Sequence, residues 1–148
     1  RFSISAYVRW DFDPLSGRFL RFQDTQEDQG TGEGYAPLID KMTGAQISAD
    51  NVVILLLPHQ YAFGTKPGNS EIIDILAEGS GYGFAARDGQ IWPINWHRLN
   101  KESIFVLSFT DGRVFPLKPG QTWFEIIGQS SRQEVYEGGI WRFLFSIP

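Results

Sequence analysis

Residues 84–96 have the sequence FAARDGQIWPINW, and this stretch decides the fold class. Two runs rich in apolar side chains flank the dipeptide Asp88-Gly89. A type I′ turn needs positive φ at both central residues, and Asp-Gly accepts this conformation, so the stretch predicts a β-hairpin. The dipeptide Asp111-Gly112 separates two further apolar runs and predicts a second type I′ hairpin, with residues 113–117 as the returning strand.

Strand patterns extend outward from this hairpin along the chain. Residues 2–12 carry apolar side chains at every even position, which is typical of a strand with one face in the core. Residues 52–57, VVILLL, predict a strand buried on both faces. Residues 71–77 fit a helix or a strand, and their three Ile residues favour a strand. Residues 122–127 predict a strand that follows a turn over residues 118–121.

The sequence shows no convincing amphipathic helix. We therefore expect an all-β or nearly all-β fold, with twisted antiparallel sheets that form a sandwich or a partly closed barrel with several hairpins. The length of 148 residues suits one β-rich domain that spans residues 1–148.

Composition excludes several classes of function. The chain has no Cys, which excludes disulfides, thiolate metal sites and Cys nucleophiles. Its net charge of −4 argues against a protein that binds nucleic-acid phosphates. The longest apolar run has six residues, far fewer than the roughly 20 that a membrane helix needs.

Three groups of turn motifs follow one another in a distinctive order. They are Asp40, Thr43-Gly44 and Asn51-Val52-Val53; Gly79-Ser80-Gly81, Arg87-Asp88-Gly89 and Trp96; and Asp111-Gly112, Pro116-Leu117 and Pro119-Gly120-Gln121-Thr122-Trp123. In this order and spacing they resemble the C-terminal domain of the YerB-like bacterial lipoproteins, a family of unknown function. The resemblance covers about residues 7–127, and we interpret residues 128–148 as a C-terminal hairpin extension.

The resemblance has implications for where the protein acts, although it implies no reaction. It implies an extracytoplasmic protein that is attached to the membrane only through a lipid anchor on an upstream segment. It also implies an upstream N-terminal domain, which we expect to be absent from this chain and to be a partner of the present domain.

The candidate ligand-binding residues share a position in or beside predicted turns, loops and strand ends. They are Asp40, Asn51, His59, Tyr61, Phe63, Ser80, Tyr82 and Trp123. Tyr61 and Phe63 belong to a long predicted loop over residues 59–69, and aromatic loop residues suit glycan or peptide binding but also pack into small clusters.

Several of these candidates also fit ordinary structural roles. Asp40 and Asn51 either bind a ligand or cap turns, which is the commoner role of Asp and Asn. A phosphate-binding loop over residues 79–83 would require a helix after it, and the sequence there predicts a strand bend or bulge instead. No catalytic residue, metal ligand or cofactor is predicted, because His59 and His97 lack a ligand spacing and no G-x-S-x-G motif is present.

Three functions are compatible with these features. The first is a non-catalytic module of a cell-envelope lipoprotein that binds a cell-wall polymer or an envelope protein. The second is a hydrolase of envelope glycan or peptide that uses Asp40 or Asp74 with His59. The third is a structural domain that supports the upstream N-terminal domain.

Overall fold

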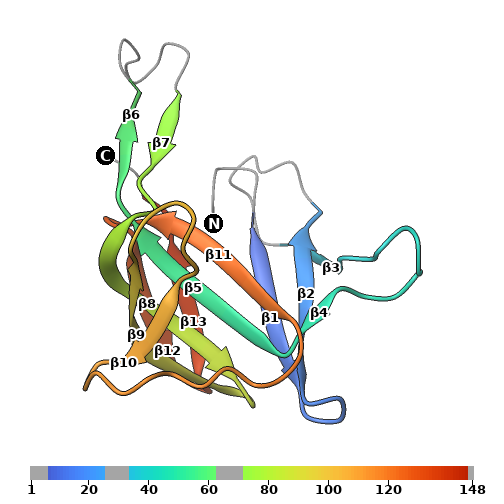
Figure 1. Cartoon of the computed structure of the whole chain (residues 1–148). Coiled ribbons are helices and arrows are strands. Elements are labelled where there is room, and N and C mark those ends of the chain that lie inside the picture. The colour runs from blue at the N-terminus through green and yellow to red at the C-terminus, as the bar shows by residue number, and fades with distance from the viewer. Residues whose placement is uncertain (1–6, 26–33, 63–71, 147–148) are drawn as a thin grey trace.

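A computed structural model describes residues 7–25, 34–62 and 72–146, and these residues form strands and no helix (Figure 1). The strands are β1 Val8–Asp13, β2 Arg18–Asp24, β3 Tyr35–Pro37, β4 Ser48–Ala49, β5 Asn51–Leu57, β6 His59–Tyr61, β7 Ile73–Ile75, β8 Gly79–Arg87, β9 Gln90–Arg98, β10 Val106–Phe109, β11 Thr122–Gly128, β12 Arg132–Tyr136 and β13 Ile140–Leu144. The all-β prediction is confirmed. Over these ranges the chain contains no helix long and apolar enough to cross a membrane.

The central sheet has five strands in the order β10-β9-β8-β5-β11. Its neighbouring strands are antiparallel except β5 and β11, which are parallel, with Asn51 opposite Thr122 and Leu57 opposite Gly128. The parallel pair was not predicted, because the two strands lie far apart in the sequence. β5 is buried at every position, which confirms the prediction of a strand covered on both faces.

The inner face of the central sheet carries the largest core cluster. It consists of Val53, Leu55, Leu57, Ala85, Ile94, Trp96, Leu107 and Phe115. Phe105, just before β10, packs against this cluster, and its ring stacks on Phe124 of β11 with centroids 6.3 Å apart. This contact joins the two edges of a curved sheet that is not closed into a barrel by strand pairing.

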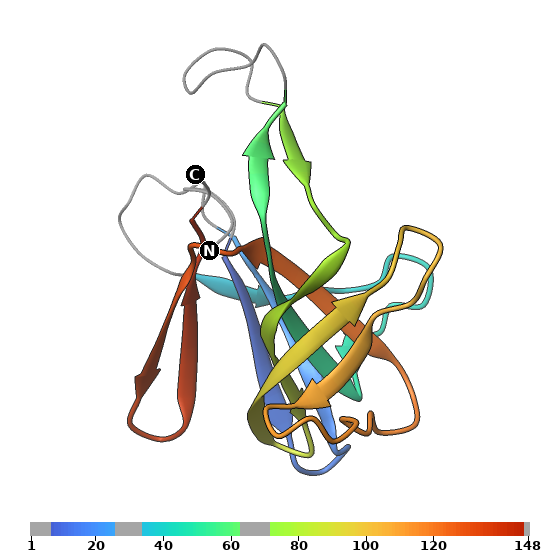
Figure 2. The same cartoon turned by 60° about the vertical axis from the view of Figure 1, so that its left-hand side comes forward.

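Two separate groups of strands cover the outer face of the central sheet. The sheet of β1, β2, β3 and β4 packs over Val52 and Ala86. The β12–β13 hairpin, which stands apart from the other strands in Figure 2, packs over Ile54 and Phe84 through three aromatic side chains, Trp141, Phe143 and Phe145. The arrangement is therefore a β-sandwich with a divided second layer.

The two Asp-Gly turns differ from each other. Asp88 and Gly89 have φ values of 49° and 73°, which confirms the type I′ hairpin between β8 and β9. At the second turn only Gly112 has positive φ, and its N–H donates to the Phe109 carbonyl, so the type I′ prediction is wrong there. Residues 113–117 return beside β10 as predicted, but they form only a single antiparallel bridge, between Val114 and Ser108, and no strand. Pro116 lacks an N–H, and Lys118 is held by Asn51, so the chain leaves the β10 edge here.

The segment after β5 forms a hairpin that extends away from the body of the domain (Figures 1 and 2). Residues 59–61, predicted as the start of a long loop, form β6 and pair with β7. The strand interpretation of residues 71–77 is confirmed by β7. The rest of the predicted loop, with Phe63, and the first part of the predicted strand over residues 2–12 lie outside the described residues.

Candidate functional site

One end of the outer face, near β10, is covered by neither group of second-layer strands in the described ranges. The side chains there come from three neighbouring strands: Ser80 and Tyr82 from β8, Asn95 and His97 from β9, and Ser108 from β10. They line a shallow, open depression together with the backbone of Gly81 and Trp96. We call these five side chains the open face.

The register of the strands brings the open face together. Ser80 lies opposite His97, and Tyr82 lies opposite Asn95, which in turn lies opposite Ser108. Because side chains alternate along a strand, all five point to the same side of the sheet, while Trp96 and Leu107 point into the inner core.

Two glycines of β8 let the sheet form beneath the open face. A Cβ atom at Gly81 would lie 2.7 Å from the Trp96 indole, so the indole occupies the space of a missing side chain. A Cβ at Gly83 would overlap the Ile54 carbonyl of β5, so this position requires close backbone approach. The glycine-rich segment pairs continuously with β9, with a positive φ of 98° only at its first residue, Gly79, and no helix follows it as a phosphate-binding loop would require.

Internal hydrogen bonds hold three of the five side chains in place. Ser80 Oγ and His97 Nδ1 are 2.8 Å apart, and the Tyr82 hydroxyl donates to the Gln129 carbonyl at 3.3 Å. The Tyr82 side chain nevertheless remains exposed, at 42% for the whole residue. These contacts orient an aromatic ring and an imidazole toward solvent, an arrangement suited to stacking and hydrogen bonding.

The open face has few of the groups that catalysis requires. A Ser–His pair needs a third group that orients the imidazole, and in the described ranges no carboxylate is bonded to His97. No cluster of three His, Asp or Glu residues that could hold a metal occurs among the residues that the structure describes.

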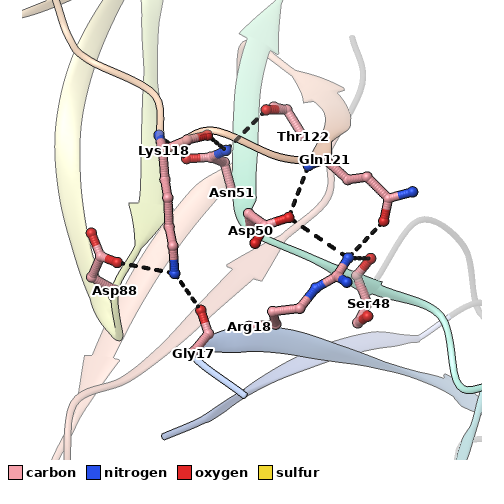
Figure 3. Close-up of polar contacts among 9 residues, drawn as sticks. All are labelled: Gly17, Arg18, Ser48, Asp50, Asn51, Asp88, Lys118, Gln121 and Thr122. Carbon is pink, nitrogen blue, oxygen red and sulfur yellow. Dashed lines mark hydrogen bonds and ion pairs between the residues drawn. The ribbon is translucent and has the colours of Figure 1, made fainter. Parts of the chain in front are cut away.

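Asn51 and the motifs around it form a second polar region, shown in Figure 3. We call it the junction network and define it as Gly17, Arg18, Ser48, Asp50, Asn51, Asp88, Lys118, Gln121 and Thr122. The Asn51 side chain is fully buried, donates to the Lys118 carbonyl and to Thr122 Oγ1, and accepts from the Lys118 N–H. It thereby fixes the turn that leads into β11.

Arg18 and Lys118 connect the β1–β2 turn to the central sheet within this network (Figure 3). Arg18 Nη2 donates to Gln121 Oε1 at 2.6 Å and lies 3.7 Å from Asp50 Oδ2. Lys118 Nζ donates to the Gly17 carbonyl at 2.8 Å and lies 3.4 Å from Asp88 Oδ1. The cationic groups of Arg18 and Lys118 are both bonded to protein atoms. Because these bonds run between the β1–β2 strands and the central sheet, the junction network joins the two sheets.

The remaining candidates have structural contacts of their own. Asp40 caps its own turn by accepting hydrogen bonds from the Met42 and Thr43 N–H groups. His59 is buried, with Nδ1 bonded to the Leu57 carbonyl at 2.8 Å. Tyr61 is half-buried on β6.

Trp123 packs on the outer face beneath the β1–β2 strands. Its ring lies 5.4 Å from the Trp10 ring, and the Arg21 guanidinium lies 4.4 Å from its centroid. Of the seven candidates within the described ranges, the structure thus brings together only Ser80 and Tyr82 on the open face.

The groups proposed for hydrolysis do not share one cleft. Asp74 pairs with Gln60 and His59 pairs with Ile75 in the β6–β7 hairpin, so Asp74 and His59 point to opposite sides of it. Asp74 is exposed, and Asp40 lies in a turn of a different sheet.

A buried carboxylate, Glu125 on β11, lies where the β1–β2 strands meet the central sheet. Trp10 Nε1 donates to its Oε1 at 3.1 Å, and Arg21 Nη2 lies 3.9 Å away. Burial raises the pKa of Glu125 above its ordinary value of 4.5, although both contacts act in the opposite direction. Glu125 therefore connects β11 to two strands of the second layer through Trp10 and Arg21.

Three residues of the open face, Asn95, His97 and Ser108, were not selected from the sequence. A signal for the first two existed, because counting outward from the type I′ turn places Asn95 opposite Tyr82 and His97 opposite Ser80. Ser108 had no such signal, since the connection between β9 and β10 is irregular.

Comparison with known proteins agrees with the fold and with the motifs. Residues 1–124 match the family model described as the C-terminal domain of a protein of unknown function, DUF3048. The chain belongs to this family. Among curated proteins, no match was found.

The structure is also similar to the crystal structure of the YerB protein from Bacillus subtilis. The TM-score is 0.62 at 22% sequence identity, over 82% of this chain and 36% of that chain. This DUF3048 domain therefore has the fold of part of YerB and spans little more than a third of its length. The resemblance to the YerB-like C-terminal domain is confirmed.

Proposed function

We propose that this DUF3048 domain is a non-catalytic binding module of a bacterial cell-envelope lipoprotein, and that the open face is its ligand-binding surface. The observation that carries the proposal is the set of four exposed side chains, Ser80, Tyr82, Asn95 and His97, beside the half-buried Ser108 on an uncovered part of the sheet. The envelope location follows from the family resemblance, and the expected ligand is a cell-wall polymer or an envelope protein.

A co-sedimentation experiment with isolated bacterial cell wall tests the proposal. We expect the wild-type domain to sediment with the wall and Tyr82→Ala to remain largely in solution, because the exposed ring provides the main contact area. Tyr136→Ala is the matched control, since Tyr136 is also an exposed strand tyrosine, at 49%, but lies on the β12–β13 hairpin. If the wild-type domain fails to sediment, or if both variants sediment equally, the open face is not a wall-binding surface.

The 2.8 Å contact between Ser80 and His97 supports a second candidate function, hydrolysis of an envelope peptide, because a Ser–His pair is one element of nucleophilic catalysis of acyl transfer. Product analysis after incubation with wall fragments distinguishes the two functions. Turnover that Ser80→Ala abolishes would favour hydrolysis. Wall binding without turnover would favour the binding module.

A further inference from the structure

The open face is made of uncharged polar side chains and one imidazole, that of His97. Its side chains are two hydroxyls, a phenol, an amide and an imidazole, with no Asp, Glu, Lys or Arg among them. The nearest Arg along β9, Arg98, points to the inner face, where it donates to the Ser103 and Lys101 carbonyls and lies 5.0 Å from the Phe105 ring. The strand alternation therefore keeps a guanidinium off this surface.

This lack of charge discriminates among envelope ligands. Polymers that carry phosphate are recognised by Arg and Lys, which form charge-assisted hydrogen bonds, and the open face offers neither. The net charge of −4 adds long-range repulsion against a polyanion. An anionic wall polymer is therefore a poor match for this surface.

The polar groups that are present match a chain of hydroxyl and amide groups. Hydroxyl and amide side chains both donate and accept hydrogen bonds, so Ser80, Asn95 and Ser108 suit a ligand with many hydroxyls. The exposed ring of Tyr82 offers an apolar surface to the C–H face of a sugar, and Val106, which is opposite His97 and 50% exposed, extends that apolar contact.

The arrangement of these groups suits an extended ligand. They lie in two rows across β8, β9 and β10, and the shallow depression is open along its length. Neighbouring strands are about 4.8 Å apart, so successive groups in a row can contact successive parts of a chain molecule. A compact ligand would be expected in an enclosed pocket instead.

We infer that the open face binds an uncharged glycan chain, an inference that rests on the proposed function and names its ligand. The chain lies across β8, β9 and β10, stacks one sugar on Tyr82 and bonds to Ser80, Asn95 and Ser108.

Isothermal titration calorimetry with a soluble β-1,4-linked N-acetylglucosamine oligosaccharide tests this inference, with a glycerol-phosphate polymer as the anionic probe. We expect the oligosaccharide to bind and Tyr82→Ala to weaken binding about tenfold or more, through loss of the stacking contact. Tyr82→Phe keeps the ring and is expected to retain most of the affinity. Tyr136→Ala is expected to bind as the wild type does.

Ionic strength provides an independent readout of ligand charge. Screening weakens contacts between charges but leaves hydrogen bonds and stacking of neutral groups largely unchanged. We therefore expect the oligosaccharide affinity to change less than about twofold between 50 and 500 mM salt. Chemical shift changes in amide NMR spectra are expected at residues 80–82 and 95–97.

The outcomes separate this inference from the proposed function. Wall sedimentation that depends on Tyr82, together with no binding of the oligosaccharide, would overturn the glycan inference and leave the binding module standing. Salt-sensitive binding of the glycerol-phosphate polymer at the open face would also overturn the glycan inference and leave the binding module standing. If neither the wall nor the oligosaccharide binds, both proposals fail. Tyr82→Phe keeps the test valid if Tyr82→Ala does not fold.

Discussion

The junction network and the open face are both polar, and both include residues of the central sheet, but their polar groups are directed differently. In the junction network, Asn51 is fully buried, and its amide is bonded to backbone and side-chain atoms of the same chain. In the open face, Asn95 belongs to the same sheet and is exposed to solvent. The same residue type thus serves folding in one region and is free to contact a ligand in the other.

This difference distinguishes most of the motifs that carry the family resemblance from the surface that we propose for function, although one of these motifs, Gly79-Ser80-Gly81, contributes Ser80 to the open face. Asn51, Asp88 and Gln121 belong to the motifs that carry the resemblance, and all three hold the junction between the sheets. A cluster of motif residues in this fold therefore marks where the layers are joined. The surface that we propose for binding lies at the other end of the sheet's outer face.

Substitution of the two asparagines by alanine gives the largest expected contrast. Asn51→Ala leaves the Lys118 N–H and carbonyl without their partner, so we expect a loss of about 3 kcal/mol in the free energy of unfolding. Asn95→Ala is expected to change it by less than about 0.5 kcal/mol. Urea denaturation measures both, and similar losses for the two variants would remove the distinction between the regions.

Gly83 lies at the border between the covered part of the outer face and the open face. Because a Cβ there would overlap the Ile54 carbonyl, Gly83→Ala must separate β5 from β8, and we expect a loss of about 2 kcal/mol. Ser80→Ala, on the same strand, is the control and is expected to unfold like the wild type. Thermal unfolding monitored by circular dichroism measures the loss of stability. An unchanged midpoint for Gly83→Ala would contradict the close approach of the two strands.

Lys118 tests whether charge contributes to the junction network. Lys118→Met removes the hydrogen bond to Gly17 and the contact with Asp88, with an expected loss of about 1 kcal/mol. The Asp88 part of this loss is expected to shrink at high salt. Lys101→Met, at an exposed position, serves as the reference, and equal stabilities of the two variants would show that the Lys118 contacts add nothing.

Glu125 gives the smallest expected effect, a change in the pH dependence of stability. Since the folded protein raises the pKa of this carboxyl above 4.5, its contribution to stability is fully present below 4.5 and is lost as the pH rises through the raised value. The stability of the wild type relative to Glu125→Gln is therefore expected to fall as the pH increases from 4 to 7. Urea denaturation across this range measures the difference, and a difference that grows with pH would reverse the assignment.

Local features of the sequence were enough to predict much of the central sheet. The Asp88-Gly89 turn fixed both the hairpin and its register, and the run VVILLL predicted the buried strand β5. The pairing of β5 with β11 was beyond prediction, since it depends on contacts between segments about 70 residues apart. The second Asp-Gly turn was misjudged because the course of the chain after it is set by Pro116 and by the bond from Lys118 to Asn51.

The candidate site was predictable only in part, because burial is decided by packing between distant segments. His59 and Trp123 had the same local appearance as Tyr82, namely a polar or aromatic side chain near a predicted loop. The packing of Phe145 against His59 and of Trp10 against Trp123 distinguishes them, and these partners come from other sheets. Tyr82 has no such covering strand in the described ranges.

The parallel pairing of β5 with β11 also has a consequence for how the domain forms. The hairpins β8–β9 and β12–β13 need only short loops to close, whereas β11 meets β5 after a separation of 71 residues between Asn51 and Thr122. Closing so long a loop costs more conformational entropy before any contact compensates for it, so we expect β11 to join the sheet late in folding. Pairing of the seven-residue strand β11 with β5 would then be the slow step of folding. During synthesis, β5 cannot complete its pairing until the C-terminal part of the chain that contains β11 has been made.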